Sequence, residues 1–172
     1  MPNKSYSIEH NNISDILHWI DKGTIGIPEM QRPFVWSTTQ VRDLIDSLYR
    51  GYPIGFIVTW QNPDASLKMG GKGQNKEIII DGQQRITALS AALMGKEIVD
   101  DKYLKKRIYI SFNPITEEFA TRSAAIAKDP KWIPDISIFS QPNFDEFEYV
   151  VNNSERLGLP GNELNKIIQK VK

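Results

Sequence analysis

Four polar side chains and one glycine stand together at residues 81–85, in the order Asp-Gly-Gln-Gln-Arg. Three isoleucines precede them and an apolar helical pattern follows, which indicates a junction between a strand and a helix. The first N–H groups of a helix have no partner within it, and with the helix dipole they attract anions. The pattern therefore predicts a phosphate-binding site at this junction.

Each residue type at the junction fits a role in binding phosphate. Gly82 has no side chain, so a phosphate can approach its backbone closely. Arg85 can offer a planar fork of donors to phosphate oxygens, and Gln83 and Gln84 can donate amide hydrogen bonds or orient a water. Asp81 can hold Mg²⁺ on a phosphate or position a nucleophilic water.

The same five residues also have a purely structural interpretation. Asp81 can cap the helix while Gly82 eases the turn. Glutamine and arginine are good helix formers on protein surfaces. The residues alone leave both interpretations open.

A second polar and aromatic group lies upstream, in the segment IPEMQRPFVW. Pro33 keeps Arg32 out of helical backbone. In one interpretation Arg32 contacts a phosphate while Phe34 and Trp36 stack on a base. In the other, the two aromatic rings pack the loop onto the core and Arg32 forms a local ion pair.

The glycine-rich run MGGKGQNK does not have the spacing of a phosphate-binding P-loop. A P-loop needs a serine or threonine after its lysine and a helix after that, whereas Lys72 is followed by Gly73 and then by a strand pattern. The run is interpreted as a loop, whose lysines at 68, 72 and 76 offer at most a weak contact to a phosphate backbone.

Composition limits the function further. The chain has 172 residues, with 21 basic and 21 acidic side chains, so bulk charge favours neither nucleic acid nor membrane as a partner. It has no cysteine and only two histidines, His10 and His18, which excludes thiolate chemistry and histidine-cluster sites within this sequence. No signal peptide or membrane-spanning run is apparent, so we expect a cytoplasmic protein that does not bind a membrane.

The periodicities predict a mixed α/β (α+β) fold, with one small sheet flanked by helices. Helices are expected around 13–20, 38–50, 83–94 and 162–172, and strands around 24–28, 55–60, 76–81 and 107–113, the last paired with 117–120. The segments 132–140 and 143–153 are ambiguous. We expect residues 1–125 to form the main domain and residues 126–172 to begin a following helical segment, in a chain that is a fragment of a longer protein.

Taken together, two stretches carry a family resemblance. The first is IPEMQRPFVWSTTQVRDLIDSLYRGYPIGFIVTW and the second is IIIDGQQRITAL. Over about residues 25–94 they resemble the N-terminal domain of GmrSD-type restriction proteins, in the ParB/sulfiredoxin-like superfamily. The resemblance implies a compact ParB/sulfiredoxin-like fold that binds and hydrolyses nucleoside triphosphates with Mg²⁺, within systems that restrict modified phage DNA.

Carried over to this sequence, the resemblance makes residues 81–85 the nucleotide site. Asp81, Gln84 and Arg85 are the expected catalytic residues, Gly82 and Gln83 join Arg85 in binding the nucleotide, and Asp81 is a candidate metal ligand. Gln31 and Arg32 form a second wall. The expected partners are a nucleoside triphosphate and DNA, the latter through the full-length protein or a partner nuclease domain.

Two other functions remain open at this point. The domain could bind nucleotide or modified DNA as a sensor without hydrolysis, or it could nick DNA directly, as suggested for ParB-like folds. The missing cysteine excludes the chemistry of the sulfiredoxin branch. The scarcity of histidines excludes a His-Asn-His nuclease within this chain.

Overall fold

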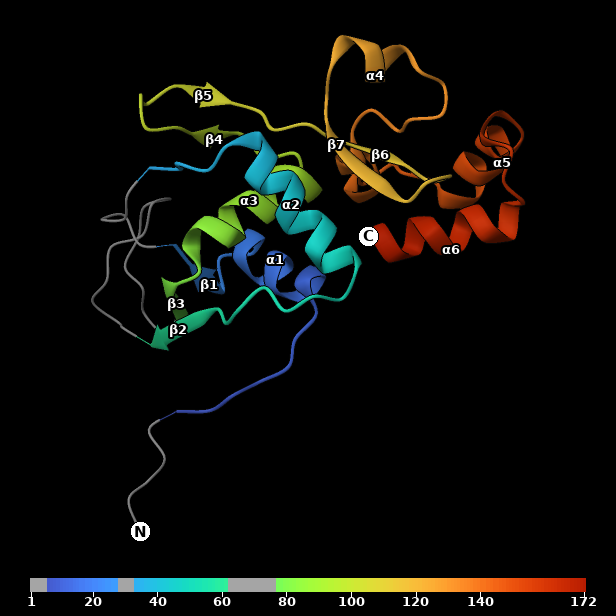
Figure 1. Cartoon of the computed structure of the whole chain (residues 1–172). Helices are drawn as coiled ribbons and strands as arrows, with labels where there is room; N and C mark the ends of the chain where they lie inside the picture. Colours follow the sequence, from blue (N-terminus) through green and yellow to red (C-terminus); the bar gives the residue numbers. More distant parts are fainter. Residues whose placement is uncertain (1–5, 28–32, 62–76) are drawn as a thin grey trace.

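The computed structural model describes residues 6–27, 33–61 and 77–172, and it has a mixed α/β fold (Figure 1). The first half contains α1 (Ile13–Asp21), β1 (Ile25–Gly26), α2 (Thr38–Tyr49), β2 (Val58–Gln61), β3 (Glu77–Asp81) and α3 (Gln83–Leu93). The second half contains β4 (Ile98–Val99), β5 (Lys105–Lys106), β6 (Ile110–Asn113), β7 (Glu118–Thr121), α4 (Ala124–Lys128), the 3-10 helix η1 (Ile136–Ser140), α5 (Glu146–Leu157) and α6 (Gly161–Val171).

The expectation of one small sheet is wrong in number, because the described strands form three. β3 lies at the centre of the largest, parallel to β1 and antiparallel to β2. Among the described strands, β4 pairs with β5 and β6 pairs with β7. The last pair confirms the predicted hairpin, whose turn is held by the Asn113 side chain accepting from the backbone N–H of Ile115 at 3.0 Å.

Strand β3 leads into the junction and is buried only in part. Ile79 is fully buried against the helices, whereas Ile80 is 54% exposed. Ile78, two residues before Ile80 and so on the same side of the strand, is only 2% exposed. This side of β3 is therefore open to solvent only at its end, next to the junction.

Helix α2 begins with a capping box that the sequence encodes locally. The N–H of Gln40 donates to the Ser37 hydroxyl at 3.2 Å, and the N–H of Ser37 donates to the Gln40 side chain at 2.8 Å. Val41, Leu44 and Ile45 then form the predicted buried stripe. The helix ends before Gly51, whose φ of 75° suits glycine.

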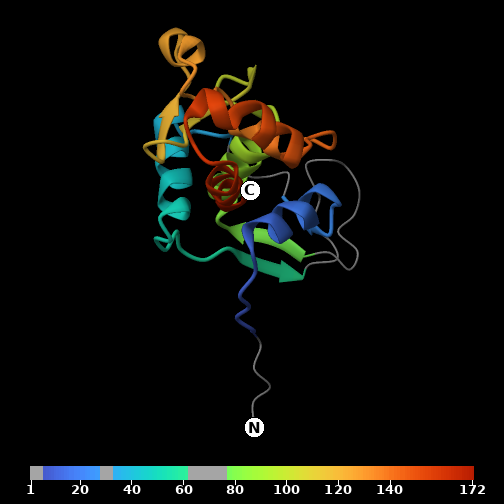
Figure 2. The same ribbon diagram turned by 90° about the vertical axis from the view of Figure 1, so that its right-hand side faces the viewer.

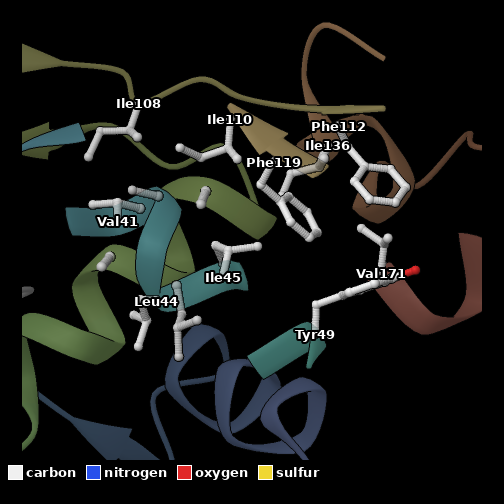
Figure 3. Packing of buried hydrophobic residues seen from close by; sticks show 14 of the residues in the cluster. Val41, Leu44, Ile45, Tyr49, Ile108, Ile110, Phe112, Phe119, Ile136 and Val171 are labelled. Carbon is white, nitrogen blue, oxygen red and sulfur yellow. The ribbon is translucent and has the colours of Figure 1, made fainter. Parts of the chain in front are cut away.

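The hydrophobic core lies between the helices and the β6–β7 hairpin (Figure 3). The aromatic rings of Tyr49, Phe112 and Phe119 lie with centroids 4.6–5.5 Å apart, which joins the end of α2 to the hairpin. Ile86 and Leu89 of α3 are fully buried in the same core. The tight packing fixes α3, and so it fixes the position of the junction before it.

The ambiguous C-terminal segments are helical: residues 136–140 form η1, and 146–157 form α5. α5 packs against α6, and Figure 2 views the molecule from the side on which these two helices lie. The Tyr49 hydroxyl donates to the Glu117 carboxylate at 2.6 Å, and the Lys170 ammonium lies 3.4 Å from the same carboxylate oxygen. The tyrosine hydrogen bond lowers the pKa of Glu117, and burial raises that of Tyr49. Leu164 and Ile168 belong to the common core. The domain boundary at residue 125 stays a prediction.

No helix in the described ranges is long and apolar enough to cross a membrane. The expected cytoplasmic location stays a prediction.

Candidate functional site

The start of α3 is an open helix terminus. Gly82 is its N-cap, with φ 91° and ψ 6°, and its carbonyl accepts the first helical hydrogen bond from Ile86 at 3.0 Å. No side chain caps this start, and no acidic residue stands in the first turn. Asp81 is thus not the cap that the structural interpretation proposed. The first N–H groups of α3 remain as donors for an anion.

These donors lie beside a cleft of about 510 Å³. Residues 81–85 line it, together with Ile80 at the end of β3 and Trp36 from the segment before α2. The structure therefore brings the whole Asp-Gly-Gln-Gln-Arg sequence to one cavity. Figure 1 shows the place, where β3 ends and α3 begins.

Arg85 is held on the wall of the cleft by two contacts. Its Nη1 donates to the Ile54 carbonyl at 2.6 Å, and its Nη2 donates to the Asp81 carboxylate at 3.2 Å. The side chain is 18% exposed, so little conformational freedom remains. A guanidinium fixed in this way keeps donors free while its plane is already oriented.

Two glycines make room for this arrangement. Gly55, at φ 87°, lies against Arg85, and a Cβ there would come within 2.5 Å of Nη1. At Gly82 a Cβ would clash with the end of the Ile57 side chain and meet Nη2 of Arg85 at 3.4 Å. Both positions favour glycine because of their positive φ, and also because Arg85 crowds position 55 and Ile57 crowds position 82.

Gln84 uses both ends of its amide to hold another segment. Its oxygen accepts from the backbone N–H of Val35 at 3.1 Å, and its nitrogen donates to the Pro33 carbonyl at 3.1 Å. These bonds tie the segment before α2 to the first turn of α3. The expected role of Gln84 in orienting a nucleophile stays a prediction. In that role the same amide would have to bind the nucleophile in addition to residues 33 and 35.

Gln83 is the buried polar residue of the cleft. It is only 6% exposed, and its side chain has no hydrogen-bonding partner among the described residues. Because the residue lines the cleft, its amide can donate a hydrogen bond to a ligand oxygen or a water there.

Asp81 is the single carboxylate among the described residues that line the cleft, and its side chain is 71% exposed. No group of three metal-ligating side chains occurs in the described ranges. Mg²⁺ often binds through one carboxylate together with substrate phosphates and waters. The donor set thus fits a Mg²⁺ ion held mainly by a nucleotide and touched by Asp81.

The two aromatic residues of the upstream segment IPEMQRPFVW have different places in the structure. Phe34 is 4% exposed, and its N–H donates to the Val99 carbonyl at 3.2 Å, so it packs as the structural interpretation expected. Trp36 is half-buried and lines the cleft. Gln31 and Arg32 lie outside the described residues, as do the lysines at 68, 72 and 76, and their roles stay predictions.

Sequence reasoning missed the turn before β2 as part of the site. The Ile54 carbonyl, Gly55 and Ile57 together position Arg85 and Gly82. Their signal was the Gly-Tyr-Pro-Ile-Gly segment, which belongs to the family pattern.

Two comparisons with known proteins bear on this site. The sequence is 27% identical over 139 residues to the uncharacterized protein MJ0686 of Methanocaldococcus jannaschii; the match covers 72% of this chain and 24% of that protein. The chain thus spans about a quarter of the length of this curated relative. Residues 13–170 also match a family described as GmrSD restriction endonuclease, N-terminal domain, a wider span than the 25–94 stretch that carries the resemblance. Because this match covers most of the sequence and includes the cleft, the chain belongs to the family of GmrSD restriction endonuclease N-terminal domains.

Proposed function

We propose that this chain is the nucleotide-binding module of a restriction protein that acts against modified phage DNA, and that it hydrolyses a nucleoside triphosphate at the start of α3. One observation carries the proposal: an uncapped helix start opens onto a cleft beside a fixed guanidinium. The family supports the wider role in restriction.

The geometry favours a phosphate group as the ligand. The free N–H groups of α3 and the Arg85 guanidinium lie on the same cleft, so an anion can contact both. The buried Gln83 amide adds a donor for a phosphate oxygen. Trp36, which also lines the cleft, would provide an aromatic surface for the base.

Hydrolysis would need an ordered water and stabilisation of the charge that develops on the phosphates. Arg85 would supply the positive charge, and Asp81 would contact the Mg²⁺ or the water. Mg²⁺ would supply neutralisation of the phosphate oxygens when bound. In this proposal the described residues bind and orient the nucleotide. The phosphates of the nucleotide would provide most of the ligands of the Mg²⁺ ion.

The test is nucleotide binding by calorimetry together with release of inorganic phosphate, for the wild type and Arg85→Ala. We expect the variant to lose turnover by about 100-fold or more, as is typical when one such donor is removed. Arg50→Ala is the matched control, because Arg50 forms the same i,i+4 pair with Asp46, at 2.8 Å, on α2. Turnover by Arg85→Ala at the wild-type rate would contradict the assignment.

A second candidate function, a sensor that binds nucleotide without hydrolysis, is favoured by two observations. Gln84 already uses its amide to hold the segment before α2, and Asp81 is the single carboxylate among the described lining residues. Calorimetry and phosphate release separate the two functions. Binding that depends on Arg85 but is followed by no phosphate release would identify the sensor.

A further inference from the structure

A second cleft, of about 800 Å³, lies away from the nucleotide site. It is formed by the first turn of α2, the segment before β6, and the end of β7 with α4 (Figure 1). Its described walls hold two arginines, a tyrosine and several hydroxyl groups, but no carboxylate. In a chain of zero net charge, this lining is a local excess of positive charge.

The strand geometry brings the three largest side chains of this cleft together. Burial alternates along residues 107–110: Arg107 and Tyr109 face outward, while Ile108 and Ile110 are buried. Arg122 lies opposite Tyr109, since its N–H donates to the Tyr109 carbonyl at 3.3 Å. The guanidinium carbons of Arg107 and Arg122 lie 5.2 Å and 4.9 Å from the centroid of the Tyr109 ring.

The two arginines differ in how they are held. Arg107 donates to the Ser137 hydroxyl at 2.9 Å and to the Asp135 carboxylate at 3.2 Å, so its charge is partly neutralised and its position fixed. Arg122 is exposed and has no carboxylate partner within the described ranges. Its charge is thus available to an external anion. Two lysines, 105 and 106, immediately precede Arg107 along the chain.

We propose that this cleft, formed around Arg107, Tyr109 and Arg122, binds the sugar–phosphate backbone of DNA. Arginine forks match phosphate oxygens in pairs, and two guanidiniums ordered by one ring can contact neighbouring phosphates of a strand. The Thr38 and Ser123 hydroxyls, on opposite walls, can donate to the same oxygens.

The cleft is too large and too open for a single small anion, whereas a strand passing over it meets cations and hydroxyls together. The family's description as a restriction endonuclease makes DNA the polyanion that the whole protein must meet. The proposal is independent of the nucleotide site, because no residue lines both clefts among those described.

The test is fluorescence anisotropy of a labelled DNA duplex titrated with the 172-residue chain at several salt concentrations. We expect Arg122→Ala to weaken binding about tenfold, as for the loss of one charge-assisted contact. The slope of log K against log salt should fall by about one. Lys22→Ala removes an exposed charge on the side of the molecule where α1 lies, and it should change neither quantity by as much.

Two further variants keep the proposal open to contradiction. Tyr109→Leu removes the ring that orders the guanidiniums, so affinity should fall while the salt slope stays near that of the wild type. Arg85→Ala should keep wild-type DNA binding even if it loses nucleotide. Equal loss of affinity in Arg122→Ala and Lys22→Ala would overturn the proposal. Displacement of the DNA by inorganic phosphate or a mononucleotide at low concentration would also do so, because it would identify a small-anion site.

Discussion

The starts of α2 and α3 use similar residues in opposite ways. At α2, Ser37 and Gln40 close the helix by bonding each other's backbone N–H groups. At α3, Gly82 provides no cap, and the side chains of the first turn reach outward: Gln84 to the segment 33–35, and Arg85 to Ile54. The N-terminal residues of α2 thus form hydrogen bonds with each other, whereas those of α3 form hydrogen bonds with distant segments.

This difference shows which of the two helix starts keeps free N–H donors. A closed start contributes to stability and offers an anion few free donors. An open start leaves N–H groups unpaired, which costs stability unless water or a ligand accepts hydrogen bonds from them. Such unpaired N–H groups can bind an anion. α3 also lies on a fully buried core face, so its open start is held rigidly beside the cleft.

The largest expected effect on stability comes from adding a side chain at Gly82, the uncapped N-cap of α3. Gly82→Ala should lower the free energy of unfolding by about 2 kcal/mol, because the residue has a positive φ and its Cβ would clash with Ile57. Gly51→Ala, at φ 75° with open space around it, should cost about 1 kcal/mol. Urea denaturation measures both; equal costs would show that the crowding at Gly82 is unimportant.

Gln84→Ala separates anchoring from catalysis. Loss of the two bonds to Pro33 and Val35 should lower the free energy of unfolding by about 1–2 kcal/mol. If Gln84 also orients the nucleophile, kcat for the nucleotide should fall while KM changes little. A wild-type kcat in a destabilised variant would assign Gln84 to anchoring alone. Gln40→Ala, the corresponding glutamine of α2, should leave kcat unchanged.

Ser37→Ala tests the closed start. Removal of the cap should cost about 1 kcal/mol in the free energy of unfolding, measured by urea denaturation. Nucleotide affinity by calorimetry should stay at the wild-type value, because Ser37 lies outside the lining of the cleft. A clear loss of affinity would mean that the two helix starts are coupled through the segment 33–37.

The smallest effect concerns the opposite end of α2, where Tyr49 contacts Glu117. The Glu117 pKa is lowered from 4.5, first by the Tyr49 hydroxyl and also by Lys170, so the carboxylate stabilises the folded state above pH 4.5. That contribution is lost as the pH falls through the lowered pKa. Glu117→Gln should thus reduce stability at pH 7 and lose that difference in strong acid. Because the side chain is 47% exposed, solvent screening keeps the effect small. A difference that persists unchanged at pH 2.5 would point to packing instead.

Much of the local structure could be predicted from the sequence. The apolar spacing of α2 and α3 and the hairpin between residues 107–113 and 117–120 are short-range signals, and the structure confirms them. The residues of the junction were also found, since their types stand out in an apolar setting. Family membership followed from the order of these motifs and is confirmed.

Other features depend on contacts between distant segments. The Arg85 contact with Ile54 and the Gln84 contact with residues 33–35 join positions 31 to 51 residues apart, and no local pattern encodes them. The division of the described strands into three sheets also depends on pairing between segments that are distant in the sequence. The second cleft depends on cross-strand pairing, which sets Arg122 beside Tyr109.

The sequence by itself determined the helix-forming segments and the strand–helix junction with its polar residues, because hydrophobic period, caps and glycines act over a few residues. Only the tertiary structure decided that Arg85 is fixed by a carbonyl from another turn and that Gln84 anchors a distant segment. It also decided that two arginines meet over one ring. Such contacts arise when the core brings remote segments together, and their energies depend on positions that the packing sets.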